Sequence, residues 1–242
     1  MSNELTKIII IGASSGIGEA LAKQYLAQGS IVGISARRIE ALQSIQKNNP
    51  GQLLVQTMDV CSPDKAIIQL DQLIKKMDGV DIIVISAGTG FINQQLEWPK
   101  EELTINTNVI GFAAMASHAM NYFLHRGSGH LVSISSISAL RGSDLAPAYA
   151  ASKAFVSNYM QGLRKKAKKM GIKVWVTDIK PGFVDTPMAK GKGLFWVCPV
   201  NKAAQQIKNA IDKKRQHAYV SKRWRLIAWL FKFLPQPIYN RI

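Results

Sequence analysis

The segment KIIIIGASSGIGEA, residues 7–20, places an apolar run of strand length directly before a glycine-rich turn. Residues 18–29 follow with apolar side chains at helical spacing and a glycine stop, so the segment predicts strand, turn and helix. The glycines have the spacing G-x-x-x-G-x-G, at Gly12, Gly16 and Gly18. Glycines allow a close backbone approach, and the helix N-terminus offers free N–H groups to a pyrophosphate. The segment therefore predicts a nucleotide-binding loop.

The same alternation of apolar runs and amphipathic stretches continues along the chain. Five further strands are predicted at residues 30–35, 53–60, 79–86, 130–135 and 173–179, and long helices at residues 103–126 and 148–170. Six β-α repeats with buried strands imply a parallel sheet covered on both faces. We therefore predict an α/β fold, a Rossmann-type doubly wound parallel sheet in one domain, with ligands at the carboxyl ends of the strands.

The composition argues against a membrane-spanning, a secreted and a metal-binding protein. The chain has 242 residues, 47% of them hydrophobic, enough for one substantial core. No stretch approaches the roughly 20 apolar residues of a membrane helix, and the N-terminus lacks the layout of a signal peptide. Cys61 and Cys198 form no C-x-x-C motif or Cys/His cluster, so we expect free thiols, no metal and a reducing, cytoplasmic location.

The net charge of +16 is unevenly distributed. Residues 1–160 contain twelve Lys or Arg and twelve Asp or Glu, whereas residues 161–242 contain nineteen and three. Such an excess indicates an anionic partner, a membrane surface or nucleic acid, or else a solvated basic surface. The basic third has no obvious stacking platform or nucleic-acid-binding module, so we expect no nucleic acid.

Two ionisable residues stand one helical turn apart in DLAPAYAASKAF, residues 144–155. Tyr149 and Lys153 share one helix face, about 5–6 Å apart at Cβ. They are either part of an ordinary amphipathic helix or an acid–base pair. In the second case the ammonium favours phenolate and lowers the phenol pKa from its reference value of about 10. The spacing alone leaves both interpretations open.

The end of the second strand bears on the type of cofactor. An NAD site places an acidic residue here for the ribose 2′-hydroxyl. This chain has Ala36 there, followed by Arg37 and Arg38. Because arginine suits a 2′-phosphate, the sequence favours NADP(H) over NAD(H). We expect Arg37 to bind the phosphate, while Arg38 either joins it or only begins the next helix.

Further motifs follow in a specific order: MDV at 58–60, SAG at 86–88, NVIG at 108–111, SISS at 133–136, YAASK at 149–153 and KPGFVDTPM at 180–188. With GASSGIG at 12–18, the set resembles the short-chain dehydrogenase/reductase family over about residues 6–200. Ile11 replaces the usual Thr, and Ile85 and Ser86 replace two asparagines. We expect these changes to alter structural hydrogen bonds rather than abolish catalysis.

The resemblance implies roles for four catalytic residues. Tyr149 would be the general acid in carbonyl reduction, or the base in alcohol oxidation, and Lys153 would lower its pKa and bind the nicotinamide ribose. Ser136, rather than Ser135, would hydrogen-bond the substrate oxygen, and Asn108 would hold a water that links Lys153 to solvent. The implied cofactor-binding residues are Gly12, Ser14, Ser15, Gly16, Ile17, Gly18, Arg37, Arg38, Asp59, Val60, Ala87, Gly88, Asn108, Tyr149, Lys153, Pro181, Gly182, Val184 and Thr186.

The predicted function is NADPH-dependent reduction of a carbonyl, or the reverse oxidation of an alcohol, on a small, largely apolar substrate. Candidate pocket residues, each alternatively a core residue, are Phe91, Ile92, Ser138, Leu140, Phe183, Leu194, Phe195 and Trp196. The alternative is a non-catalytic NADP(H) sensor or a membrane-docking protein on the same fold. The resemblance also implies a homodimer or homotetramer joined through the helices that hold Asn108 and Tyr149.

The C-terminal segment is apolar and basic. We assign residues 1–221 to the cofactor-binding catalytic domain and residues 222–242 to a helical extension of it. The helix predicted at residues 222–234 is too apolar for a simple surface helix and too short to span a bilayer. It packs on its own domain, forms an oligomer contact, or lies in a membrane interface with Trp224 and Trp229 as anchors.

Overall fold

The computed structural model describes residues 5–47, 49–189, 194–221 and 223–239. Its sheet has seven parallel strands in the order β3-β2-β1-β4-β5-β6-β7. Their bounds are β1 Lys7–Ile11, β2 Ile31–Ala36, β3 Leu53–Thr57, β4 Ile82–Ile85, β5 Ser128–Ile134, β6 Lys173–Pro181 and β7 His217–Val220. The strand order changes direction between β1 and β4, which confirms the predicted doubly wound sheet.

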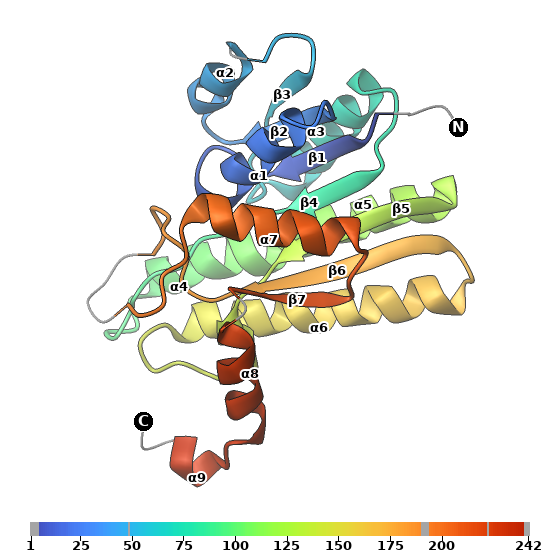
Figure 1. Ribbon diagram of the computed structural model, residues 1–242. Helices are drawn as coiled ribbons and strands as arrows, with labels where there is room; N and C mark the ends of the chain where they lie inside the picture. The colour runs from blue at the N-terminus through green and yellow to red at the C-terminus, as the bar shows by residue number, and fades with distance from the viewer. Residues whose placement is uncertain (1–4, 48, 190–193, 222, 240–242) are drawn as a thin grey trace.

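Helices cover both faces of this sheet (Figure 1). Helices α1, α2 and α7 pack on one face, and α3, α5 and α6 on the other. The helix bounds are α1 Gly16–Leu26, α2 Ile39–Lys47, α3 Pro63–Lys76, α4 Trp98–Ile105, α5 Phe112–Arg126, α6 Pro147–Lys169, α7 Val200–Asp212, α8 Trp224–Phe233 and α9 Gln236–Tyr239. A π-helical segment, η1, spans Asn106–Gly111, and a 3-10 helix, η2, spans Ile137–Leu140.

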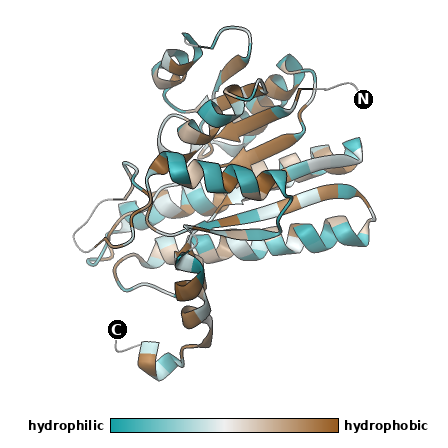
Figure 2. Ribbon diagram, in the orientation of Figure 1, coloured by the Kyte–Doolittle hydropathy of each residue, from teal (hydrophilic) through white to brown (hydrophobic). Residues whose placement is uncertain are grey.

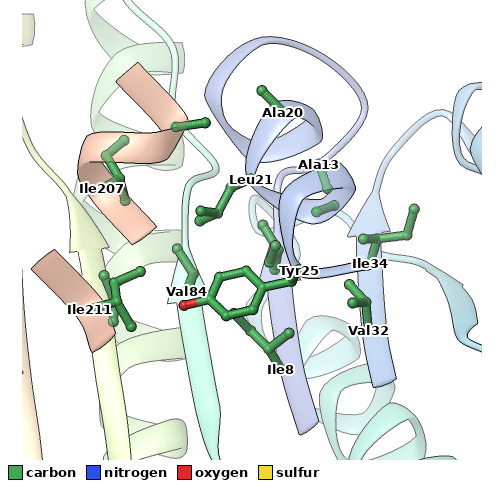
Figure 3. Close-up of a cluster of buried hydrophobic side chains, with 14 of the residues drawn as sticks. Ile8, Ala13, Ala20, Leu21, Tyr25, Val32, Ile34, Val84, Ile207 and Ile211 are labelled. Carbon is green, nitrogen blue, oxygen red and sulfur yellow. The ribbon is translucent and has the colours of Figure 1, made fainter. Parts of the chain in front are cut away.

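The apolar run of β1 is explained by burial on both faces. Ile8 and Ile10 join the core under α1 and α7, and Ile9 and Ile11 join the core on the opposite side. Figure 3 shows the first of these cores, where Tyr25 lies among aliphatic side chains near Ile211. Side chains alternate across a strand, so a strand with two covered faces reads as a nearly continuous apolar run.

The structure adds two local features to the sequence prediction. The helix predicted over residues 103–126 is divided into α4, η1 and α5. A π-helical turn admits an extra residue, and such turns are frequent at functional sites. The sequence analysis also missed β7, which pairs with β6 at one edge of the sheet. With four residues, this strand is too short for a clear periodic pattern.

The last two helices extend away from the sheet, beyond the carboxyl end of β7 (Figure 1). Arg141 ties them to the loop after η2, because its Nε donates to the Phe231 carbonyl at 2.8 Å and its Nη2 to the Leu234 carbonyl at 2.6 Å. None of the helices described here is both long and apolar enough to cross a membrane.

Candidate active site

The glycine loop joins β1 to α1, and two of its glycines leave no room for a side chain. Gly12 has φ +90°, and a Cβ there would lie 2.4 Å from the amide nitrogen of Ala87. A Cβ on Gly18 would lie 2.2 Å from the Gly12 carbonyl oxygen. Two glycines are therefore required for the close approach of the turn to the end of β4 and to α1. The loop ends at the first turn of α1, whose N–H groups suit a phosphate.

The loop after β6 reaches this turn at the carboxyl ends of the strands. The side chain of Thr186 comes within 3.2 Å of where a Cβ on Gly16 would lie. Pro181 is buried at the end of β6, and Val184 belongs to the core under α1 and α7. Thr186 is thus brought to the predicted cofactor site, whereas the side chain of Val184 faces the core.

The predicted adenine end lies beside β2 and β3. Arg38 donates from Nη2 to the Ser14 hydroxyl at 3.4 Å, which places the second arginine against the glycine loop. Arg37 is exposed next to it. Asp59 accepts from the Cys61 amide at 3.0 Å, and Val60 is buried. The sequence ranked Arg37 first, but Arg38 makes the described contact with the loop.

Ser136 and Tyr149 meet at the carboxyl end of β5, where the side chain of Ser136 lies close enough to the Tyr149 phenol to lower its pKa. Ser136 caps η2 and accepts from the Ser138 amide at 3.1 Å. Ser135 instead donates to the Ile179 carbonyl at 2.9 Å, within the sheet. The predicted serine, and not its neighbour, therefore faces the tyrosine. Gly90, which the sequence analysis missed, packs on the phenol ring, since a Cβ there would lie 2.4 Å from Tyr149 Cδ2.

Lys153 lies beneath this pair in a buried position. Its Nζ donates to the Ile134 carbonyl at 3.1 Å and is 5.6 Å from the centroid of the Tyr149 ring. Burial lowers the pKa of Lys153 to about 8, and the carboxylate of Asp178 partly offsets this effect. Asp178 itself forms a buried ion pair with Lys180 on β6. The ion pair of Asp178 and Lys180, which the sequence analysis did not identify, thus lies near Lys153.

The direction of the Tyr149 pKa differs from the sequence-based prediction. Burial raises this pKa, and the hydrogen bond from Ser136 lowers it by less. The net direction is therefore opposite to the effect expected from Lys153 alone, because desolvation of the phenolate dominates. The phenol is protonated at neutral pH, which is the form that a general acid requires.

Asn108 connects three parts of the site. Its Nδ2 donates to the Thr89 carbonyl at 2.7 Å and to the Ser152 hydroxyl at 3.0 Å, and its Oδ1 accepts from the Thr89 amide at 2.8 Å. A Cβ on Gly88 would lie 3.2 Å from Lys153 Nζ and 3.3 Å from Asn108 Oδ1. The π-helical turn therefore brings Asn108 to the loop after β4 and to α6, beside the lysine.

An aromatic cluster lies next to the reaction centre and is formed by Phe183, Phe195, Trp196 and Trp224. The ring of Trp224 is 5.3 Å from that of Phe183, 5.1 Å from that of Phe195 and 6.2 Å from that of Trp196. Trp224, absent from the predicted pocket, covers Gly182, where a Cβ would lie 2.1 Å from its Nε1. The buried Nε1–H has no hydrogen-bond partner in the described part of the chain.

The other predicted pocket residues are more dispersed. Ser138 and Leu140 belong to η2, Phe91 and Leu194 are half-buried, and Ile92 is largely exposed. A cavity of about 300 Å³ lies between the loop after η2 and α6, but neither Tyr149 nor Lys153 lines it. Within the described residues, no three His, Cys, Asp or Glu side chains gather as metal ligands.

Comparisons with known proteins show which family the chain is similar to. A family model described as short chain dehydrogenase matches residues 6–194. An uncharacterized oxidoreductase of Myxococcus xanthus is 31% identical over 96% of this chain and 94% of its own. A solved short-chain dehydrogenase from Streptomyces avermitilis superposes with a TM-score of 0.81 at 25% identity, covering 94% of this chain and 91% of that one.

A Burkholderia phymatum short chain dehydrogenase/reductase, solved in complex with NAD, has the same fold with a TM-score of 0.84 at 17% identity, over 95% of this chain and 94% of that one. The glycine loop, the paired serine and tyrosine, the buried lysine and the family match together identify the chain as an oxidoreductase that belongs to the short-chain dehydrogenase family.

Proposed function

We propose that this protein is an NADPH-dependent reductase of small, largely apolar carbonyl compounds. The observation that carries this proposal is the placement of Ser136, Tyr149 and Lys153 together at the carboxyl end of β5, beside the glycine loop. Ligands of doubly wound sheets bind at this end. The aromatic cluster next to the site supports an apolar substrate.

The residues divide the chemistry among themselves. A bound nicotinamide would supply the hydride. Ser136 lies beside Tyr149, so both hydroxyls can meet a carbonyl oxygen on which negative charge grows. Tyr149 then gives its proton to that oxygen. The raised pKa of Tyr149 supports the reductive direction, because the phenol is protonated before the reaction.

Lys153 and Asn108 restore the proton. The pKa of Lys153, about 8, lies near physiological pH, so its ammonium can give up a proton and regain it. Asn108 holds the loop after β4 beside this nitrogen through Thr89. The implied role of Asn108 in holding a water between Lys153 and solvent remains part of the proposal.

Two arginines support the preference for NADPH. Arg37 and Arg38 follow β2 where an acidic residue would favour NAD, and Arg38 touches Ser14 of the glycine loop. Arg37→Ala and Arg38→Ala should each weaken NADPH binding in a fluorescence titration far more than NADH binding. Equal losses for the two cofactors would show that both arginines are structural.

The catalytic assignment is tested by Tyr149→Phe, which removes the proton donor and hardly changes shape. This variant should bind NADPH normally and lose nearly all turnover against a panel of apolar ketones, aldehydes and quinones. The control is Tyr159→Phe on the same helix, whose ring stacks on Phe155. Near-normal turnover by Tyr149→Phe would contradict the mechanism.

We also propose a homodimer or homotetramer in the cytoplasm, with peripheral lipid contact through residues 222–234. Leu103, Ile105 and Ile110 are exposed on α4 and η1, near the helices expected to join the subunits. Cys61 and Cys198 are free thiols, which suits a reducing compartment. Lys222 lies outside the described residues. Sedimentation velocity measures the oligomeric state. A monomer at micromolar concentration would contradict the proposed homodimer or homotetramer.

A further inference from the structure

Helix α8 has two apolar faces in different surroundings. Trp224 and Ala228 are buried against the domain. The outer stripe is formed by four side chains that are 46–68% exposed, Leu226, Trp229, Leu230 and Phe233. Their spacing of i, i+3, i+4 and i+7 makes one continuous surface. In Figure 2 this helix is coloured mostly as hydrophobic and extends away from the body of the domain.

The exposed side chains of the outer stripe are adjacent to one another and form one continuous apolar surface. The rings of Trp229 and Phe233 lie 5.2 Å apart within it, and Ile238 of α9 is also exposed. Contiguous exposed apolar surface of this kind marks an interaction site.

Charge indicates what this surface binds. Arg223 and Arg225 are exposed at the start of α8, and residues 213–242 contain eight Lys or Arg and no Asp or Glu. The lysines at the end of α6 and the basic residues 213–215 precede β6 and β7, so they lie at the amino ends of these strands, whereas α8 follows the carboxyl end of β7. A helix with aromatic and aliphatic side chains on one face and arginines beside it fits the headgroup region of an anionic bilayer.

The inner face of the same helix packs beside the candidate active site. Trp224 covers Gly182 and packs on Phe183. Ile137, which directly follows Ser136, belongs to the same apolar cluster. Trp224 is 97% buried, yet its Nε1–H has no acceptor among the described residues. Buried donors are normally paired, so this one is available for an acceptor on a ligand.

We propose that α8 docks on an anionic lipid bilayer through the outer stripe, and that the aromatic cluster on its inner face receives a lipid-soluble carbonyl substrate. The indole N–H of Trp224 donates to a second acceptor on that substrate, while Ser136 and Tyr149 hold the reacting oxygen. The reaction rests on the proposed reductase activity, whereas lipid docking does not.

Vesicle cosedimentation tests the docking. The full-length protein should bind phosphatidylglycerol/phosphatidylcholine vesicles at low salt, and bind less at high salt or to pure phosphatidylcholine. Trp229→Glu should weaken binding about tenfold. Ile68→Glu, which places the same charge at a 58% exposed isoleucine on α3, should not. Absence of wild-type binding at low salt overturns the proposal, as does equal binding by the two variants. Dissociation of an oligomer by Trp229→Glu, without vesicle binding by the wild type, would make the stripe a contact between copies of the chain.

Reduction rates for a water-soluble and a vesicle-borne ketone distinguish lipid docking from the reaction itself. Trp229→Glu should reduce a water-soluble ketone at the wild-type rate and a long-chain ketone in anionic vesicles about tenfold more slowly. Equal rates for the vesicle-borne ketone would overturn delivery from lipid. Failure of every carbonyl substrate with the wild type would contradict the proposed function and leave the vesicle-binding result standing.

The proposed hydrogen bond from Trp224 to the substrate is tested by KM values. Trp224→Phe retains an aromatic ring and removes the N–H. It should raise KM about tenfold more for a long-chain 3-keto ester, which carries a second acceptor, than for the matching simple ketone. Equal effects on the two substrates would show that Trp224 only packs the site.

Discussion

Replacing Lys153 by methionine should make the cofactor-free protein more stable while it abolishes catalysis. Methionine is unbranched and apolar, so it can occupy the same buried position without charge. The ordinary pKa of a lysine is 10.5, and burial lowers that of Lys153 to about 8. The difference of about 2.5 corresponds to about 3 kcal/mol. Loss of the hydrogen bond to the Ile134 carbonyl lowers the free energy of unfolding by about 1 kcal/mol. The substitution should therefore raise the free energy of unfolding by about 2 kcal/mol in total at pH 7.

The pH dependence identifies the cause. Below pH 8 the folded and unfolded proteins both carry the charge, and the folded protein bears the full cost of burying it. Between pH 8 and 10.5 only the unfolded chain keeps the proton, so the stability of the wild type rises with pH. The advantage of Lys153→Met should therefore shrink by about 2 kcal/mol between pH 7 and pH 9.5.

Urea denaturation of the cofactor-free proteins at both pH values measures this effect. Lys165→Met is the matched control, because Lys165 lies on the exposed side of the same helix. Its difference from the wild type should be small and independent of pH. A Lys153→Met protein that is less stable than the wild type at pH 7, or a difference that does not change with pH, would refute the reasoning.

Three further substitutions test separate parts of the structure. Gly90→Ala should lower kcat because its Cβ would lie 2.4 Å from the Tyr149 ring, whereas Gly142→Ala, with no atom within 4 Å, should not; equal kcat values for the two would contradict the packing. Gly162→Ala, in open space on α6, should raise the free energy of unfolding by about 0.5–1 kcal/mol in urea, and a loss would show a hidden contact. Burial lowers the pKa of His130 to about 4, so an unfolded histidine binds its proton first as pH falls below 6.5. The wild type should lose about 2 kcal/mol more stability than His130→Asn between pH 7 and pH 4.5, and parallel losses would contradict this.

Much of the site could be predicted because its key spacings are local. Tyr149 and Lys153 lie on one helix, and Gly12, Gly16 and Gly18 lie in one turn, so the chain holds each set together wherever the rest of it goes. The motifs also follow strands whose carboxyl ends meet in any parallel sheet of this order. The family resemblance added the roles of Asn108 and Ser136, which spacing alone does not imply.

Other features depend on contacts between distant segments. Trp224 covers Gly182 only because β7 pairs with β6 and returns the chain to the end of the sheet. Asp178 and Lys180 form a buried ion pair on a strand that the sequence predicts only as apolar and extended. Neither contact leaves a local pattern in the sequence.

The sequence by itself determined the alternation of the first six strands with helices, the nucleotide-binding turn and the pairing of Tyr149 with Lys153, because each depends on neighbours within a few residues. The tertiary structure decided the π-helical turn at Asn108, the two faces of α8 and the direction of the Tyr149 pKa. A lysine one turn away favours the phenolate, but desolvation by the surrounding fold disfavours it more strongly. How strongly a group is desolvated is set by every segment that packs around it, so it is known only once the chain has folded.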